Sequence, residues 1–202
     1  MLAWAPSFQG SEPPTEPGRF RLQLDNQQGL AGSGRRPGAV VRLCLAHGVT
    51  PVFIPFAEPW RNGIVEHYND TFDKSFFRTE RFTDPDRLAA RYAEFTTFHN
   101  ARHRYSALGG LTPDQAQARA GFTPTPPDPD VTLPHGFDGL TGTVEYVRLI
   151  RSDAKLRVLD HHFDLPDEVV YSYVVAVLDI AAEALTVHYH GVAVTTFPFP
   201  LR

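Results

Sequence analysis

Residues 59–77, PWRNGIVEHYNDTFDKSFF, decide how the fold of this 202-residue chain is interpreted. Apolar residues recur there at three- and four-residue steps, which is typical of a helix with one face packed on a core: Ile64, Val65, Tyr68, Phe72, Phe76 and Phe77. Glu66 lies outside this stripe and near the start of the predicted helix. An acid at this position is either a solvated residue favoured by the helix dipole or a residue of a functional site.

The residues before this helix predict alternating strands and helices. Arg21–Leu24 alternates polar and apolar side chains and runs into Asp25, which indicates a short strand that ends on an acid. Ala39–Ala46 has the pattern of a helix, and Gly48 stands where a C-terminal cap is expected. Val49–Ile54 is an apolar run typical of a buried strand. The order strand, helix, strand, helix predicts an α/β fold.

The second half of the chain changes its pattern. A helix is predicted over residues 84–99 with Thr83 as its N-cap, and Pro113 is expected in the first turn of another short helix. Residues 122–134 are rich in proline and predict a linker. From Gly142 onward, short runs of β-branched and aromatic residues separated by turns predict about five strands of a small antiparallel barrel.

Charge and composition limit the kinds of function that the chain is expected to have. Residues 19–120 carry 14 basic and 10 acidic side chains, whereas residues 121–202 carry 5 and 11, so the basic excess that favours nucleic acid lies in the first of these segments. The single cysteine, Cys44, falls in an apolar helical run, which predicts a buried thiol and no internal disulfide. No apolar run approaches the ~18 residues needed to span a bilayer, so we expect a cytoplasmic protein without a membrane partner.

Four blocks of the sequence together resemble the integrase catalytic core of DDE transposases, the retroviral-integrase-like enzymes of bacterial insertion sequences. In family order they are LQLDN (22–26), VVRLCLAHGVTPVFIP (40–55), EPWRNGIVEHYNDTFDKSFF (58–77) and FHNARHRYSALGGLTP (98–113). The resemblance implies the rear part of a ribonuclease-H-like core over 19–120. The proline content predicts a disordered tail over 1–18 and a linker over 121–137, and the strand pattern predicts a small all-β barrel over 138–202. In the family this barrel assists DNA binding or subunit contact, and its acidic charge here favours subunit contact at least as much.

The resemblance also implies a chemistry. Enzymes of this family cleave and transfer DNA strands with Mg²⁺ or Mn²⁺, and Asp25 and Glu66 match the second and third of their three catalytic, metal-binding acids. Gln27 stands where many members have glycine. No aspartate precedes Asp25, so the first catalytic acid is missing, and we expect an N-terminally truncated core that is inactive as this fragment. The alternative is a non-catalytic DNA-binding or oligomer-interaction fragment. The implied partners are transposon-end and target DNA, and either full-length transposase or a second copy of the chain.

Further candidates follow from the same blocks. The side chains that the resemblance places near DNA are Arg61, Asn62, Asn69, Lys74, Arg102 and Arg104. Trp60 either stacks on a base or anchors the start of the helix by packing, and packing is favoured. His99 and His103, one helical turn apart, lack the third and fourth ligands of a zinc site, so we expect no metal there.

Overall fold

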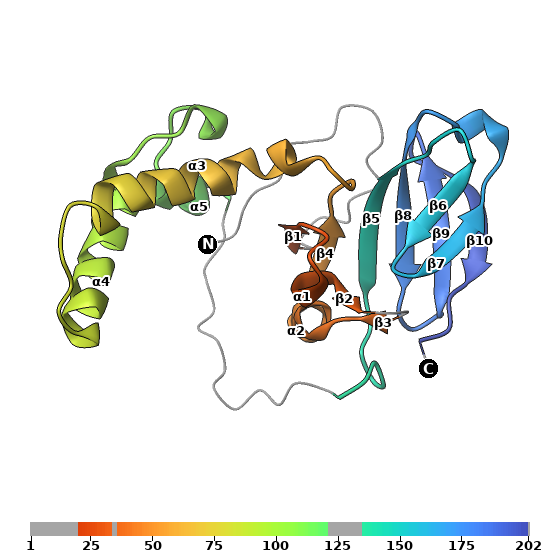
Figure 1. Ribbon diagram of the computed structural model, residues 1–202, viewed down its shortest axis with the longest axis horizontal. Helices are drawn as coiled ribbons and strands as arrows, with labels where there is room; N and C mark the ends of the chain where they lie inside the picture. Colours follow the sequence, from red (N-terminus) through yellow and green to blue (C-terminus); the bar gives the residue numbers. More distant parts are fainter. Residues whose placement is uncertain (1–19, 34–35, 121–134, 202) are drawn as a thin grey trace. The chain divides into compact units, whose positions relative to one another are not determined.

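The computed structural model describes residues 20–33, 36–120 and 135–201 (Figure 1). The expected tail over 1–18 and nearly all of the expected linker over 121–137 lie outside these residues. The described residues form two compact units: one contains those up to Val65 together with those from 135 onward, and the other begins at Glu66 and ends at 120. The boundary between the units falls inside a helix.

The elements alternate between helix and strand in the first half of the chain and are mostly strands in the second. In chain order they are β1 (Phe20–Leu24), α1 (Gln28–Ala31), β2 (Gly32–Ser33), β3 (Arg36–Pro37), α2 (Ala39–Ala46), β4 (Val49–Phe53), the 3₁₀ turn η1 (Pro59–Asn62), α3 (Gly63–Phe72), the π-helical turn η2 (Asp73–Phe77), α4 (Pro85–Arg102), η3 (Ser106–Leu108), α5 (Pro113–Arg119), β5 (Thr143–Leu149), β6 (Lys155–Val158), β7 (His161–Asp164), η4 (Asp167–Val169), β8 (Tyr173–Asp179), β9 (Ala184–Tyr189) and β10 (Val192–Pro198).

One six-stranded sheet organises the first unit. Its strand order is β1-β4-β5-β8-β9-β10. The pairs β1–β4 and β4–β5 are parallel, whereas β5, β8, β9 and β10 form an antiparallel series. The connection from β1 to β4 passes through α1 and α2, as a parallel pair requires. The strand, helix and strand predicted between residues 21 and 54 are therefore confirmed.

The predicted closed barrel is not seen. Instead, the described strands form an open sheet with β1 and β10 at its edges, and β6 and β7 form a separate hairpin that crosses in front of it (Figure 1). The physical reason lies at β5. Its register with β4 pairs Val52 with Glu145 and Phe53 with Tyr146, so the edge of β5 onto which β10 would have to close is already occupied. The mixed α/β content is nonetheless that expected of a ribonuclease-H-like core.

The main core of this unit lies on one face of the sheet. Phe53 of β4 and Tyr146 of β5 are fully buried there, with ring centroids 5.2 Å apart. Val41 of α2 and Leu156 of the β6–β7 hairpin belong to the same buried cluster. The integrase-like segment and the C-terminal strands thus share a hydrophobic core. The expected domain boundaries over 121–138 stay predictions, but β4 and β5 lie in one sheet.

The local structure around α2 is as the sequence predicts. The helix spans Ala39–Ala46, and Gly48 follows it with a φ of 67°, a left-handed conformation that glycine adopts at low cost. Cys44 is buried, as expected, and burial raises the pKa of its thiol. This helix packs on β4 and fixes the crossover between the two parallel strands.

The second unit is a small helical arrangement held together by aromatic side chains. Phe72 lies at its centre, and its ring lies near those of Phe76, Tyr92 and Phe95, with centroids 4.9 to 5.7 Å apart. The predicted helix over 59–77 is confirmed, although it begins with a 3₁₀ turn and ends with a π-helical turn. The predicted N-cap Thr83 is wrong.

Asp84 caps α4 instead, because its carboxylate accepts a hydrogen bond from the backbone N–H of Arg87 at 2.7 Å. The short helix α5 has Pro113 in its first turn, as predicted, and Thr112 and Gln115 form a reciprocal capping box. None of the helices in the described ranges is both long and apolar enough to cross a membrane.

Candidate DNA-processing site

Asp25 lies directly after β1, at the carboxyl end of the parallel pair β1–β4. Carboxyl ends of parallel strands are where α/β sheets usually hold ligands. The carboxylate is half-buried, and its Oδ1 accepts a hydrogen bond from the backbone N–H of Gln27 at 2.8 Å. This contact closes a tight turn and orients the acid. The other oxygen, Oδ2, remains for a ligand. Gln27 contributes only backbone to this contact, so the absence of glycine at this position does not prevent the turn.

Asn26 ties the ends of β1 and β4 together. Its side-chain amide donates to the backbone carbonyl of Ile54 at 2.6 Å, and its side-chain oxygen accepts from Nη2 of Arg148 at 2.8 Å. The main chain next to Asp25 is therefore held by hydrogen bonds from both sides of the strand end.

Arg148 is a buried arginine that binds Asn26 and several backbone carbonyls at this end of the sheet. It is 4% exposed, and it also donates to the backbone carbonyls of Ile54, Val147 and Arg157 at 2.8 to 3.0 Å. Its guanidinium lies over the ring of Phe56 at 4.3 Å. Burial lowers the pKa of Arg148 to about 10, which still leaves it protonated at neutral pH. A fixed positive charge with oxygen partners on several strands thus lies close to the carboxyl end of β1.

A second polar cluster fixes the chain where it leaves β4 and enters α3. Glu58 is 7% exposed and accepts from the hydroxyl of Tyr173 at 2.7 Å and from Nε of Arg61. The guanidinium of Arg61 lies 5.0 Å from the ring centre of Tyr173. The side-chain amide of Gln23 donates to the backbone carbonyl of Arg61 at 2.8 Å and to the side-chain oxygen of Asn62 at 3.0 Å. These contacts attach the start of α3 to β1 and β8.

Two of the predicted DNA-binding residues are therefore already engaged. Arg61 pairs with a buried carboxylate and Asn62 accepts from Gln23, so both help to hold the first turn of the helix in place. Trp60 does not anchor the helix by packing, as the sequence favoured, because 67% of its side chain is exposed. A large aromatic surface is thus available to a partner beside this turn.

Glu66 and Asn69 are exposed on α3. Glu66 lies in the first turns of the helix, outside the aromatic stripe, as the sequence predicts. Lys74 makes an exposed ion pair with Asp70 one turn earlier, at 2.7 Å. An exposed pair of this kind is weak and readily exchanged for another charged partner.

The remaining candidates lie at the end of α4 and in the loop after it. Arg102 is exposed in the last turn of α4, and Arg104 donates to the backbone carbonyl of Gly110 at 2.8 Å. His99 is 4% exposed, and its Nε2 lies 2.8 Å from the hydroxyl of Tyr105. The ring of His103 stacks on that of His99 with centroids 4.7 Å apart. Both histidines belong to the aromatic packing between α4 and the η3 segment.

Asp25 and Glu66 are the two predicted metal ligands. Carboxylates are suitable ligands for Mg²⁺, and Asp25 has a free oxygen at a strand end. Asp25 belongs to the first unit, however, and Glu66 is the first residue of the second. Within residues 20–33, 36–120 and 135–201, no three carboxylate, histidine or cysteine side chains come together as a metal site would require. Asp25 and Glu66 therefore stay predicted metal ligands.

Sequence reasoning missed the polar residues that hold the site. Arg148 is one of two charged residues in the largely buried strand β5, which could have marked it as special, but its partners lie up to 122 residues away and no pattern reveals them. Glu58 and Tyr173 are likewise 115 residues apart. Only the fold brings these groups together.

Comparison with protein families finds one match within the chain. Residues 47–113 match the family model of the integrase core domain. The match runs from the residue before Gly48 to the first residue of α5, so it includes Glu66 and all six predicted DNA-binding residues and excludes Asp25 and the C-terminal strands. A comparison with curated proteins gave no match. Residues 47–113, about a third of the chain, are therefore similar to the integrase core domain.

Proposed function

We propose that the protein is a transposase- or integrase-type protein that acts on DNA. The observation that carries the proposal is the match of residues 47–113 to the integrase core domain, because this segment contains the helix with Glu66. The basic excess of residues 19–120 and the exposed Trp60 support contact with nucleic acid.

The chemistry proposed for the core is phosphodiester cleavage and strand transfer with Mg²⁺ or Mn²⁺. Such ions, when bound, activate the attacking oxygen and stabilise the leaving one. Asp25 and Glu66 are the carboxylates proposed to bind them. In this view the Gln27 N–H orients Asp25, and the network of Asn26 and Arg148 holds the strand end beneath it.

Two carboxylates are fewer than a two-metal site uses. We therefore propose that the 202-residue chain by itself performs little or no strand transfer. The six polar candidates would then contact DNA phosphates or bases: Arg61, Asn62, Asn69, Lys74, Arg102 and Arg104.

A second candidate function is a non-catalytic DNA-binding or oligomer-interaction protein. The observation that favours it is the structural engagement of Arg61 and Asn62, which suits a helix start used for positioning, together with the exposed aromatic surface of Trp60. A protein of this kind could join an intact transposase without cleaving DNA.

A DNA-binding and nicking experiment separates these functions. The probes are a fluorescein-labelled random duplex, followed by anisotropy at low salt, and a supercoiled plasmid incubated with Mg²⁺ or Mn²⁺. Both functions predict binding to the duplex that weakens as salt rises. Nicking that Glu66→Gln abolishes, and that the matched control Asp70→Asn on the same helix retains, would establish the enzyme. Binding without nicking is compatible with both functions, because the chain by itself is short of one metal ligand, and absence of binding at low salt would contradict both.

A further inference from the structure

The hydroxyl of Tyr173 links the C-terminal strands to the segment that leads into α3. It donates to Oε1 of Glu58 at 2.7 Å, and Nε of Arg61 donates to Oε2 of the same carboxylate. Glu58 is 7% exposed, and leaving a buried carboxylate oxygen without a donor is costly. Both oxygens are thus held, one by strand β8 and the other by the turn η1.

Tyr173 reaches Glu58 from one face of the sheet, whereas Arg148 reaches the end of β1 from the other. In the register of β5 with β8, Leu149 pairs with Tyr173 and Arg148 pairs with Val174. Because successive side chains of a strand point to opposite faces, Arg148 and Tyr173 lie on different sides of the sheet. The packing agrees, since Val174 belongs to the main core and Tyr173 packs against a smaller buried cluster around Val175. The pair β5–β8 therefore holds β1 and η1 from two sides.

The turn η1 is fixed where α3 begins. Besides the contact of Tyr173 with Glu58, the side-chain amide of Gln23 in β1 donates to the backbone carbonyl of Arg61 at 2.8 Å, and the Arg61 guanidinium lies over the Tyr173 ring at 5.0 Å.

Glu66 follows this turn closely. Val65 is still part of the first unit, and Glu66 is the next residue of the same helix. Four helical residues span ~6 Å, so Glu66 lies about one turn beyond Asn62, the last residue of η1. A helix is stiff over one turn, and the contacts that hold η1 therefore also determine how α3 leaves the sheet.

We propose that Tyr173 is a positioning residue for Glu66. Its hydroxyl fixes Glu58, and Glu58 together with Arg61 fixes the turn from which the helix that carries Glu66 begins. This inference rests on the proposed function, in which Glu66 is a metal ligand. Groups that orient a metal ligand contribute about 10–100-fold to metal affinity, and because Tyr173 acts through further contacts, we expect an effect of about five- to tenfold. The C-terminal strands then take part in the site as well as in the stability of the sheet.

The test is the affinity of the full chain for Mn²⁺ in the presence of a short duplex DNA, followed by electron paramagnetic resonance of the free ion. Tyr173→Phe is expected to weaken this affinity by about five- to tenfold. Glu58→Gln keeps an oxygen for the Tyr173 hydroxyl but removes the charge that holds Arg61, and it is expected to weaken the affinity as well. Each variant is measured where circular dichroism shows it fully folded, because lower stability alone does not change the affinity of the folded protein.

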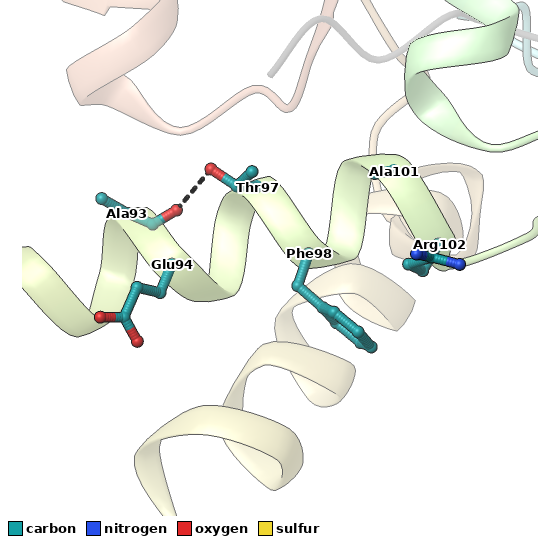
Figure 2. A pocket seen from close by; sticks show the side chains of 6 residues that line it. All are labelled: Ala93, Glu94, Thr97, Phe98, Ala101 and Arg102. Carbon is teal, nitrogen blue, oxygen red and sulfur yellow. Dashed lines mark hydrogen bonds between the residues drawn. The ribbon is translucent and has the colours of Figure 1, made fainter.

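Two control variants remove a hydroxyl elsewhere. Tyr171→Phe changes a tyrosine whose side chain is 76% exposed, two residues before Tyr173. Thr97→Val removes a hydroxyl beside a shallow groove on α4, where it donates to the backbone carbonyl of Ala93 in the same helix at 2.9 Å (Figure 2). Both controls are expected to bind Mn²⁺ as the wild type does.

Double variants show whether Tyr173 acts through Glu66. Added to Glu66→Gln, Tyr173→Phe is expected to have no further effect, because the ligand that it positions is gone; added to Asp25→Asn, its effect is expected to remain. If Glu66→Gln weakens Mn²⁺ binding and Tyr173→Phe does not, the inference is overturned and the proposed function stands. An effect of Tyr173→Phe that persists in Glu66→Gln would also overturn the inference. Equal affinity of the wild type and Glu66→Gln would overturn both.

Discussion

Arg148 donates a hydrogen bond to the side-chain oxygen of Asn26 at 2.8 Å, across 122 residues of sequence. Asn26 follows the proposed metal ligand Asp25, and Arg148 lies in β5. All three residues lie outside residues 47–113, the segment that matches the integrase core domain. A C-terminal strand therefore helps to hold the strand end on which the proposed chemistry depends. This relationship makes Arg148 the first residue to test.

Replacing Arg148 is expected to destabilise the first unit. Arg148→Met removes the donors to Asn26 Oδ1 and to three buried backbone carbonyls, and hydrogen bonds from charged groups contribute about 1.5–3 kcal/mol each in mutational series. Because the methionine also relieves the burial of a charge, we expect a net loss of about 3 kcal/mol in the free energy of unfolding. Urea unfolding followed by circular dichroism measures it. Arg151→Met, at an exposed arginine, serves as the control, and an equal effect of the two changes would contradict this role.

Replacing Tyr173 is expected to lower the stability of the protein, because its hydroxyl donates a hydrogen bond to the buried carboxylate of Glu58. Tyr173→Phe removes a single hydroxyl and leaves Oε1 of Glu58 without that donor in a site that is 7% exposed. The expected loss is about 1–3 kcal/mol in the free energy of unfolding. Tyr171→Phe is the matched control, because the Tyr171 side chain is 76% exposed. Thermal unfolding of both variants measures the difference, and a Tyr173→Phe protein as stable as the control would show that the contact contributes nothing.

Gly32 is expected to be irreplaceable in the turn after α1. Its φ is 111°, and a Cβ at this position would lie 2.4 Å from the backbone oxygen of Arg36 and 2.5 Å from the nitrogen of Gly38. Gly32→Ala therefore forces the main chain to move and is expected to cost more than the ~1 kcal/mol of an ordinary glycine-to-alanine conformational effect. Gly29→Ala, which meets nothing within 4 Å, is expected to be neutral or slightly stabilising. Urea titrations of the two variants compare them, and similar midpoints would contradict the strained geometry.

The stability of the second unit is expected to depend on pH because of His99. Burial lowers the pKa of His99 below its ordinary value of 6.5, and the adjacent His103 lowers it further. Because the folded pKa is lower than the unfolded one, the neutral ring contributes stability that is fully present above pH 6.5 and is lost as the pH falls through the folded pKa. The titratable groups packed around this ring are Tyr68, His103 and Tyr105.

The corresponding measurement compares thermal unfolding at about pH 7.5 and about pH 5.5, on either side of the ordinary histidine pKa. The wild-type protein is expected to lose more thermal stability on acidification than His99→Gln, in which position 99 no longer titrates. If both proteins lose the same amount, His99 does not carry the effect.

The local elements could be predicted from the sequence because their signals are local. The periodicity of residues 59–77, the glycine after α2 and the proline at the start of α5 each determine a helix through its own residues. The N-cap of α4 was misassigned by one residue, since Thr83 and Asp84 are both good caps and only the contact with the Arg87 N–H selects between them.

The arrangement of the strands could not be predicted in the same way. Pairing of β4 with β5 joins residues more than 90 positions apart, and nothing in either strand specifies this neighbour. The sequence therefore suggested a closed barrel where the structure has an open sheet. A turn at Leu159, with a φ of 53°, folds residues 155–164 into the β6–β7 hairpin, which packs outside the six-stranded sheet.

The residues of the candidate site also fall into two groups: those that the sequence predicts and those that only the structure reveals. Asp25 and Glu66 were identified from motifs, and Asp25 does lie at a strand end. The residues that hold their surroundings, such as Arg148, Glu58 and Tyr173, come from distant parts of the chain and become visible only in the folded protein.

The most direct test of the proposed function is the affinity of the protein for Mn²⁺ in the presence of a short duplex DNA, measured from the free Mn²⁺ signal in electron paramagnetic resonance. We expect Asp25→Asn and Glu66→Gln each to weaken Mn²⁺ binding by about tenfold or more, because each removes a carboxylate ligand of a hard cation. Asp70→Asn, at an exposed acid on the same helix as Glu66, is expected to bind as the wild type does. Equal Mn²⁺ affinity in all four proteins would contradict the proposal that Asp25 and Glu66 are the metal ligands of an integrase-type site.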